Sequence, residues 1–201
     1  MIIRFLDILF SSVALIFFSP LFFITAIILK STAEGEIFYF QKRIGFRKKS
    51  FFLIKFATML KDSPTIGSKT ITLKNDKRVL PIGKFLRKFK INELPQLLNI
   101  LKGEMSIIGP RPLTNETFNM YSKEVQKKII DVKPGLSGVG SIYYSNEEEF
   151  LADDGVEFYK NRIAPYKGKL EIWYNENRSL YLYLMLILLT GLTFVFKSNK
   201  L

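Results

Sequence analysis

Two long apolar stretches bracket a region in which apolar and polar residues are mixed. The first, Ile8 to Leu29, carries no charge and is about 22 residues long, enough for a helix to cross roughly 30 Å of hydrocarbon. Ser19-Pro20 interrupts this stretch. Proline removes a backbone donor and clashes with the preceding turn, so we expect the helix to bend there into halves of roughly 15 Å each.

The bend leaves two topologies open. In a re-entrant pair, both halves enter one leaflet, and Ser19 hydrogen-bonds the carbonyls that the kink frees. In the alternative, one helix spans the bilayer and tolerates its proline. Basic residues follow the stretch, among them Lys30, Arg43 and Arg47, and they predict that the body of the protein lies on the cytoplasmic side.

The second apolar stretch, Leu180 to Phe196, is also uncharged and is followed by Lys197 and Lys200. About 17 residues is the lower limit for a membrane span. An interfacial helix fits equally well, with Tyr181 and Tyr183 near the lipid headgroups, and we favour it. The pattern thus divides the chain into a membrane segment (1–30), a central region of mixed polarity (31–179) and a C-terminal apolar helix (180–201).

The central region predicts an α+β fold that is mostly helical. Residues 37–40 and 51–54 are aromatic and β-branched runs on either side of a basic turn, which indicates a small β-hairpin. Residues 84–90 have the pattern of an amphipathic helix. Asn92 is a good N-cap for a helix to Leu101, because Glu93 and Pro95 both suit a first turn. We also expect helices over 114–132, capped by Thr114 or Asn115, and over 147–162.

Composition limits the chemistry. The 201 residues include no cysteine and no histidine, which excludes disulfides, thiolate metal sites, cysteine nucleophiles and histidine bases. The formal net charge of +12 indicates an anionic partner: nucleic acid, acidic lipid or a phosphorylated substrate. Two membrane-length apolar stretches favour an anionic lipid bilayer over nucleic acid.

Glu93 is the first candidate for chemistry, because it combines a carboxylate with a predicted helix start and several nearby cations, including Arg87. A helix start attracts anions, and Glu93 could hold Mg²⁺ that bridges a diphosphate. The alternative is an ordinary cap beside a solvated basic face.

Arg111 is the second candidate, because prolines on both sides restrict its backbone and its guanidinium fits a phosphate. The alternative is a rigid turn without a ligand. The glycine-rich loop after Lys133 is a weaker signal for ligand approach.

Several segments, taken in order, resemble one family. They are Ser19-Pro20, Lys55-Phe56-Ala57-Thr58-Met59, Asn92-Glu93-Leu94-Pro95-Gln96-Leu97, Leu101 to Ser106, Gly109-Pro110-Arg111-Pro112-Leu113, Lys133 to Gly138 and Tyr174 to Ser179. In this order and spacing they resemble the bacterial sugar transferase family, small monotopic phosphoglycosyl transferases that start glycan assembly on a polyprenyl-phosphate carrier. The resemblance covers nearly the whole chain.

The resemblance implies a re-entrant helix broken at Ser19-Pro20, at the cytoplasmic face of the bacterial inner membrane. It implies transfer of a sugar phosphate from a nucleotide-diphosphate sugar, usually a uridine one, to undecaprenyl phosphate. It further implies Mg²⁺ as cofactor, bound by Glu93, with Arg111 on a phosphate, and a catalytic domain at the cytoplasmic face over 31–179. We expect Arg87 and Lys133 to help in binding the diphosphate. Downstream glycosyltransferases would be further partners, and nucleic acid would not.

The chain departs from the family at a central position, because Asn92 stands where the resemblance implies a nucleophilic Asp. A carboxamide is neutral and a far poorer nucleophile than a carboxylate. Three explanations follow: direct attack by the lipid phosphate, Glu93 acting as the nucleophile, or an inactive membrane scaffold. Because Glu93, Arg111 and the glycine-rich loop are retained, we predict an active enzyme. Val139-Gly140-Ser141 departs from a Trp-Ala-Gln common in the family and leaves the sugar open.

Overall fold

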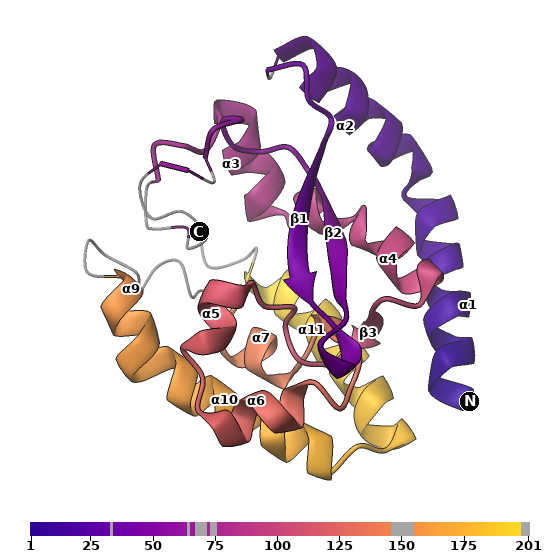
Figure 1. The fold of residues 1–201 in the computed structure, drawn as a ribbon. Coiled ribbons are helices and arrows are strands. Elements are labelled where there is room, and N and C mark those ends of the chain that lie inside the picture. Colours follow the sequence, from indigo (N-terminus) through magenta and orange to yellow (C-terminus); the bar gives the residue numbers. More distant parts are fainter. Residues whose placement is uncertain (33, 64, 67–71, 73–75, 146–154, 198–201) are drawn as a thin grey trace.

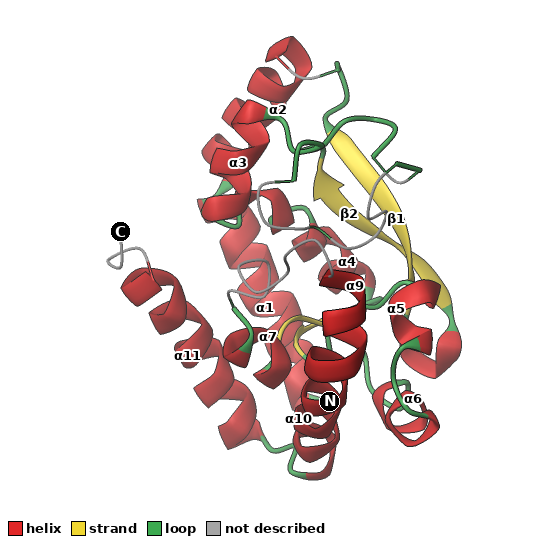
Figure 2. Ribbon diagram, turned by 90° about the vertical axis from the view of Figure 1, so that its left-hand side faces the viewer, coloured by secondary structure: helices red, strands yellow, loops and turns green. Residues whose placement is uncertain are grey.

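The structure, a computed structural model, describes residues 1–32, 34–63, 65–66, 72, 76–145 and 155–197. Its helices are α1 (Ile2–Phe17), α2 (Ser19–Thr32), α3 (Pro81–Lys88), α4 (Gln96–Lys102), α5 (Asn115–Asn119), α6 (Lys123–Ile129), α7 (Val139–Tyr143), α9 (Gly155–Phe158), α10 (Ala164–Glu176) and α11 (Leu180–Lys197). Its strands are β1 (Phe38–Ile44), β2 (Ser50–Phe56), β3 (Ser106–Ile108) and β4 (Gly135–Ser137). The predicted class, α+β and mostly helical, is confirmed. In Figures 1 and 2 the β1–β2 hairpin lies on one flank of the helical body, and the far end of α2 projects away from α10 and α11.

The predicted bend at Ser19-Pro20 is present. The axes of α1 and α2 differ by 62°. The Ser19 hydroxyl donates to the carbonyl of Ile16 at 2.8 Å, which satisfies an acceptor that the break would otherwise expose. Among the described helices, none taken singly has both the length and the apolarity to cross a bilayer, whereas α1 and α2 reach them only as a pair.

The predicted hairpin is also present, and its register decides which side chains reach the interior. β1 and β2 are antiparallel, with Tyr39 opposite Lys55 and Arg43 opposite Phe51. Because side chains alternate along a strand, Arg43 and Lys55 project from the same face. The opposite face carries Phe40 and Phe52, which are exposed.

Asn99 attaches α4 to the hairpin. It is fully buried, its Oδ1 accepts from the Ile54 backbone N–H at 3.0 Å, and its Nδ2 donates to the Phe52 carbonyl at 2.8 Å. A neighbouring core cluster contains Leu53, Ile100 and Met105. This connection fixes α4, and with it the segment that precedes α4, against the face of the hairpin.

β3 and β4 form a short parallel pair that was not predicted. Ser106 lies opposite Gly135 and Ile108 opposite Ser137. The pairing continues beyond the strands, where the Gly135 N–H donates to the Pro110 carbonyl at 2.8 Å. A β-carbon on Gly135 would come within 2.1 Å of the Gly109 nitrogen, so glycine is required for the backbones to approach this closely. The glycine-rich loop therefore packs backbone against backbone.

Three predicted helices differ from the structure. Asn92 is not an N-cap: it lies inside a 3₁₀ turn, Ile91–Glu93, and α4 begins only at Gln96 after Pro95. The predicted helix over 114–132 is divided into α5 and α6, capped by Thr114 and Ser122 respectively. Of the predicted helix over 147–162, residues 147–154 lie outside the described part, and 155–162 join a π-helical turn, Tyr159–Ile163, that continues into α10.

Candidate active site

The inward face of the hairpin and the Pro-Arg-Pro turn form a basic pocket. It is lined by Arg43, Leu53, Lys55, Gln96, Arg111, Pro112, Gly135 and Leu136. Arg43 donates through Nη1 to the Pro112 carbonyl at 2.9 Å and through Nη2 to Gln41. Its Nε is buried without a hydrogen-bond partner among the described residues, so a donor remains available to a ligand.

Glu93 lies among these cations. Its side chain is 15% exposed, and its Oε1 is 3.8 Å from Nη2 of Arg111. Burial by itself would raise the pKa of Glu93, but Arg111, Lys90, Lys55 and Arg87 together lower it below its ordinary value. Glu93 is therefore ionised at neutral pH.

The cations repel one another. Burial and the charges of Arg43, Arg111 and Arg87 hold the pKa of Lys55 well below its usual range, against the opposing effect of Glu93. Burial and Arg111 likewise lower the pKa of Arg43. A single carboxylate does not neutralise such a cluster, and a bound polyanion would relieve the repulsion. The pocket therefore has the electrostatics of a phosphate site.

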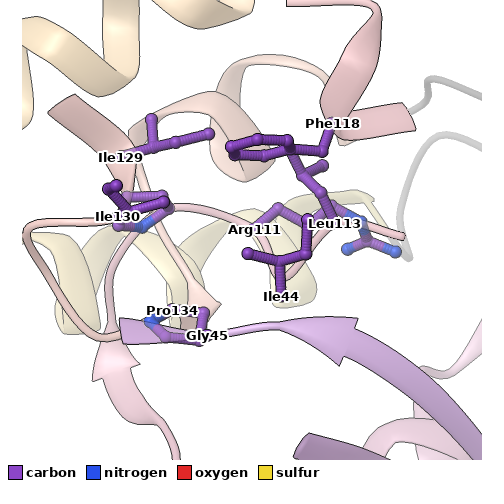
Figure 3. A pocket seen from close by; sticks show the side chains of 9 residues that line it. Ile44, Gly45, Arg111, Leu113, Phe118, Ile129, Ile130 and Pro134 are labelled. Atoms are coloured by element: carbon purple, nitrogen blue, oxygen red, sulfur yellow. The ribbon is translucent and has the colours of Figure 1, made fainter. Parts of the chain in front are cut away.

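Arg111 joins the basic pocket to a second, apolar pocket. This second pocket is lined by Ile44, Gly45, Pro110, Arg111, Leu113, Phe118, Ile129, Ile130 and Pro134. In Figure 3 the Arg111 guanidinium points away from Ile129 and Ile130. The base of the Arg111 side chain thus lines the apolar pocket, whereas its guanidinium is directed towards Glu93. The side chain as a whole is 38% exposed.

Asn92 is 6% exposed, and its Oδ1 has no hydrogen-bond partner among the described residues. The turn that contains it begins at Lys90, which has a left-handed backbone conformation with φ of 55°. Non-glycine residues adopt this region at a cost and commonly do so at functional sites. The turn therefore presents a buried amide oxygen that a ligand could engage.

The predicted site residues do not all come together. Glu93, Asn92, Arg111 and Arg87 belong to one region, in which Arg87 also donates to Thr72 Oγ1 at 2.9 Å. Lys133 lies elsewhere. Its ammonium is in the field of Arg4 and Asp7, and it would be 3.6 Å from a β-carbon on Gly103.

Sequence reasoning did not assign two cations that line the pocket, Arg43 and Lys55, to the site. One signal was present, because Lys55 is a lone charge between Ile54 and Phe56 in an otherwise apolar strand. A lysine that is partly buried in such a strand needs a partner or a ligand. Arg43 gave no such signal, since it belongs to a basic run and only the register shows that it points inward.

The residues present fit Mg²⁺ only together with a phosphorylated ligand. In the part of the chain that the structure describes, no group of three or more acidic side chains could hold a metal by itself. Glu93 and the orphaned Asn92 Oδ1 offer two oxygens of the kind that Mg²⁺ prefers. Mg²⁺ typically binds one or two protein oxygens plus substrate phosphates, so the cation and a diphosphate would occupy the pocket together.

The fold and the pocket define a protein with a basic pocket, suited in its charge to a phosphorylated ligand, next to a bent pair of apolar helices. Comparison with known proteins is more specific: residues 1–197 match the model of the family described as "Bacterial sugar transferase". The chain belongs to this family.

Relatives in several bacteria are similar along most of the chain. The exopolysaccharide production protein ExoY of Rhizobium meliloti is 33% identical, with 93% of this chain and 82% of the relative covered. The UDP-N-acetylgalactosamine-undecaprenyl-phosphate N-acetylgalactosaminephosphotransferase of Aeromonas hydrophila is 34% identical over 93% of this chain and 42% of its own length. The UDP-glucose:undecaprenyl-phosphate glucose-1-phosphate transferase of Klebsiella pneumoniae is 34% identical, with 92% and 38% covered. The chain thus spans less than half of the last two.

Proposed function

We propose that this protein transfers a sugar phosphate from a nucleotide-diphosphate sugar, a UDP-sugar by analogy with its relatives, to undecaprenyl phosphate. The observation that carries the proposal is the cluster of half-buried cations around one carboxylate, Glu93, beside the apolar pair α1–α2. The names of the Aeromonas and Klebsiella relatives support the same donor and acceptor. The reaction would be the first membrane step of glycan assembly, at the cytoplasmic face of the bacterial inner membrane.

The chain's own residues account for binding and charge. Arg111, Arg43 and Lys55 hold the diphosphate of the donor and stabilise the charge that develops on it, and Arg87 adds to their field. Glu93 and Asn92 would hold Mg²⁺, which supplies charge neutralisation of the phosphates when it is bound. Lys133 has no part in this set, because it lies near Arg4 and Gly103.

The chemical step forms a bond from an incoming oxygen to the phosphorus that carries the sugar and breaks the bond to the nucleoside monophosphate, which leaves. In the route that we favour, the incoming oxygen belongs to the lipid phosphate, because Asn92 is a poor nucleophile. Alignment and charge stabilisation supply the rate in this route. In the other route, Glu93 attacks first and forms a covalent phosphosugar intermediate.

The proposal is tested with membranes containing the protein, radiolabelled nucleotide sugars, undecaprenyl phosphate and Mg²⁺. We expect one lipid-linked product from one donor, and chelation of Mg²⁺ should abolish it. In Glu93→Gln the rate of product formation should fall at least 100-fold, as is usual when a charge-stabilising group is removed. Glu124→Gln, an exposed carboxylate in α6, is the matched control and should retain activity. Absence of product from every donor would refute the proposal.

Asn92 favours a second candidate function, a non-catalytic member of the family that recruits other glycosyltransferases to the membrane. The two functions separate in cells. A scaffold requires the protein but not its carboxylate, so Glu93→Gln would then leave glycan synthesis unchanged. An enzyme requires both.

A further inference from the structure

Helix α11 presents an apolar face to its surroundings. The chain carries no charge from Leu180 to Phe196. Exposed side chains recur on one stripe of the helix, at the spacing of three to four residues that such a stripe requires; they are Tyr181, Leu184, Leu188 and Leu192. Tyr181 is 76% exposed and Leu188 is 63% exposed. A contiguous apolar patch on a protein surface marks a site of contact with lipid or with another protein.

The opposite face of α11 is attached to the body of the protein at two points. Near the start of the helix, Tyr183 is buried, and its hydroxyl donates to the Asp7 carboxylate at 2.8 Å. Two turns later, the Thr190 hydroxyl donates to the Leu186 carbonyl at 2.7 Å. It therefore accepts from Ser137 of β4, whose Oγ is 2.8 Å from Thr190 Oγ1. Leu186, between the two points, is buried.

These attachments are incompatible with a membrane span by α11. A span needs about 20 residues to cross roughly 30 Å of hydrocarbon. Tyr183 to Thr190 are held against the same body that holds Asp7 and Leu29, near the two ends of the α1–α2 pair. Only the turns after Thr190 can leave this body, and Gly191 to Lys197 rise only about 10 Å.

The neighbouring surface indicates that lipid, and not protein, covers the apolar face of α11. α11 packs beside α1, where Ile3 and Leu6 contact the cluster that contains Leu186. On the outward side of α1, Phe5 and Leu9 are exposed. Figure 2 shows α11 on the same side of the molecule as the α1–α2 pair, with the β1–β2 hairpin on the other side. The apolar face of α11 thus continues the apolar surface of the bent pair, and one bilayer surface can cover both.

We propose that this face of α11 is a second lipid-binding surface, which lies in the interface of the leaflet that the α1–α2 pair enters. Tyr181 lies at the level of the headgroups, where tyrosine is favoured, and Leu184, Leu188 and Leu192 contact the acyl chains. The helix begins and ends on one side of the membrane. The inference requires that the α1–α2 pair contacts lipid, but it does not depend on the transferase reaction.

The second surface also affects the site. Thr190 is bonded to Ser137 of β4, and Gly135 at the start of β4 packs against the backbone before Arg111. Together with the bent pair, α11 therefore gives the body two separate contacts with the membrane, and these fix the tilt and the depth of the basic pocket relative to the lipid headgroups.

The test places a fluorophore on the proposed surface of the full chain. Because the chain has no cysteine, Leu188→Cys can be labelled with an environment-sensitive dye and reconstituted in vesicles of phosphatidylcholine and phosphatidylglycerol. The vesicles contain lipid with a nitroxide quencher either just below the headgroup or near the end of the acyl chain. We expect blue-shifted emission and stronger quenching by the shallow nitroxide, because an interfacial helix does not reach the centre of the bilayer. Leu184→Cys should behave in the same way.

Val156→Cys is the matched control, because Val156 is also an exposed aliphatic side chain on a helix, α9. In Figures 1 and 2, α9 lies apart from α11. The dye at this position should emit as it does in water, and neither nitroxide should quench it. A cysteine added after Leu201 completes the set: a water-soluble maleimide should label it in inside-out vesicles and not in intact cells.

Three results would overturn the proposal. Emission at Leu188→Cys that is typical of water would show that no lipid covers the face. Blue-shifted emission that neither nitroxide quenches, with disulfide cross-linking of unlabelled Leu188→Cys between two copies, would assign the face to a second copy of the chain. Labelling of the added cysteine in intact cells would show that α11 crosses the membrane. None of these measurements requires turnover, so the lipid contact and the proposed transferase function can fail independently.

Discussion

Asn92 and Glu93 are neighbours with different electrostatics. Glu93 is held ionised by the surrounding cations, whereas Asn92 offers an unpaired but neutral oxygen. A carboxylate at position 92 would enter a field that is strongly positive, so its cost of burial would be offset. We therefore expect the pocket to accept an aspartate at position 92, the residue that the family resemblance implies. The native asparagine limits nucleophilic attack by this side chain rather than ligand binding.

Asn92→Asp is accordingly expected to increase turnover several-fold and to give a covalent phosphosugar adduct, because a carboxylate is a competent nucleophile and a carboxamide is not. The measurements are the rate of lipid product formation and intact-protein mass spectrometry after incubation with donor alone. Asn119→Asp, an exposed change at the end of α5, is the control. Slower turnover without an adduct would mean that the amide oxygen itself is needed.

Glu171 of α10, which is only 3% exposed, has a predicted effect on stability. Its pKa is raised from an ordinary 4.5 to about 7 in the folded state, so folding favours the protonated form. Stability from this group is therefore present at low pH and lost as the pH rises from 4.5 through 7. Glu171→Gln does not titrate, so relative to the wild type it should gain roughly 3 kcal/mol in free energy of unfolding between pH 4 and pH 8.

Unfolding at several pH values checks this, with Glu176→Gln expected to follow the wild type throughout. A constant difference between Glu171→Gln and the wild type would show that Glu171 is not titrating in this range.

At the scale of the element, strong local signals made the hairpin and the bend at Ser19-Pro20 predictable. The turn before α4 was not, because Asn92, Glu93 and Pro95 satisfy the rules for a helix start while Lys90 diverts the chain through a left-handed conformation. The prediction of one helix over 114–132 was wrong for a similar reason, because Ser122 caps a new helix inside an apparently continuous helical pattern.

The parallel pair β3–β4 could not be predicted, because three-residue strands have no usable periodicity and their pairing joins distant segments. The same limit applies to the site. Glu93, Arg111 and Arg87 lie in recognisable motifs, whereas Arg43 and Lys55 join them only through the hairpin register. Lys133 was predicted from its motif and is directed elsewhere by the path of the loop.

The glycines of β3–β4 lead to a prediction at this scale. Gly135→Ala should destabilise the fold by about 2–4 kcal/mol, the range for a forced overlap in a packed interior, and should reduce activity by displacing Arg111. Gly191→Ala in α11 is the control, because a β-carbon there has nothing within 4 Å and alanine is the better helix former. Melting temperatures of the two variants should change in opposite directions, and equal changes would contradict the role given to Gly135.

On the scale of the whole molecule, the bent pair α1–α2 is attached at both ends to the same body. Near its start, the Asp7 carboxylate accepts from Ser106 Oγ, the Ile107 N–H and Tyr183 Oη, at 2.9, 2.9 and 2.8 Å. Near its end, Leu29 is fully buried in a cluster with Phe56 and Leu86. The residues around the bend are apolar and exposed, with Phe17 at 73% and Phe23 at 72%.

This arrangement predicts that both ends of the pair lie on one side of the membrane, since a body attached to both ends cannot be on both sides. The chain has no cysteine, so single cysteines can be introduced without a background. With a water-soluble maleimide, Ile2→Cys and Ser31→Cys should be labelled in inside-out vesicles and not in intact cells, as should Glu124→Cys in the body. Phe17→Cys should resist labelling from both sides. Labelling of the first two from opposite sides would require Asp7 or Leu29 to leave its buried partners, and the re-entrant arrangement would be wrong.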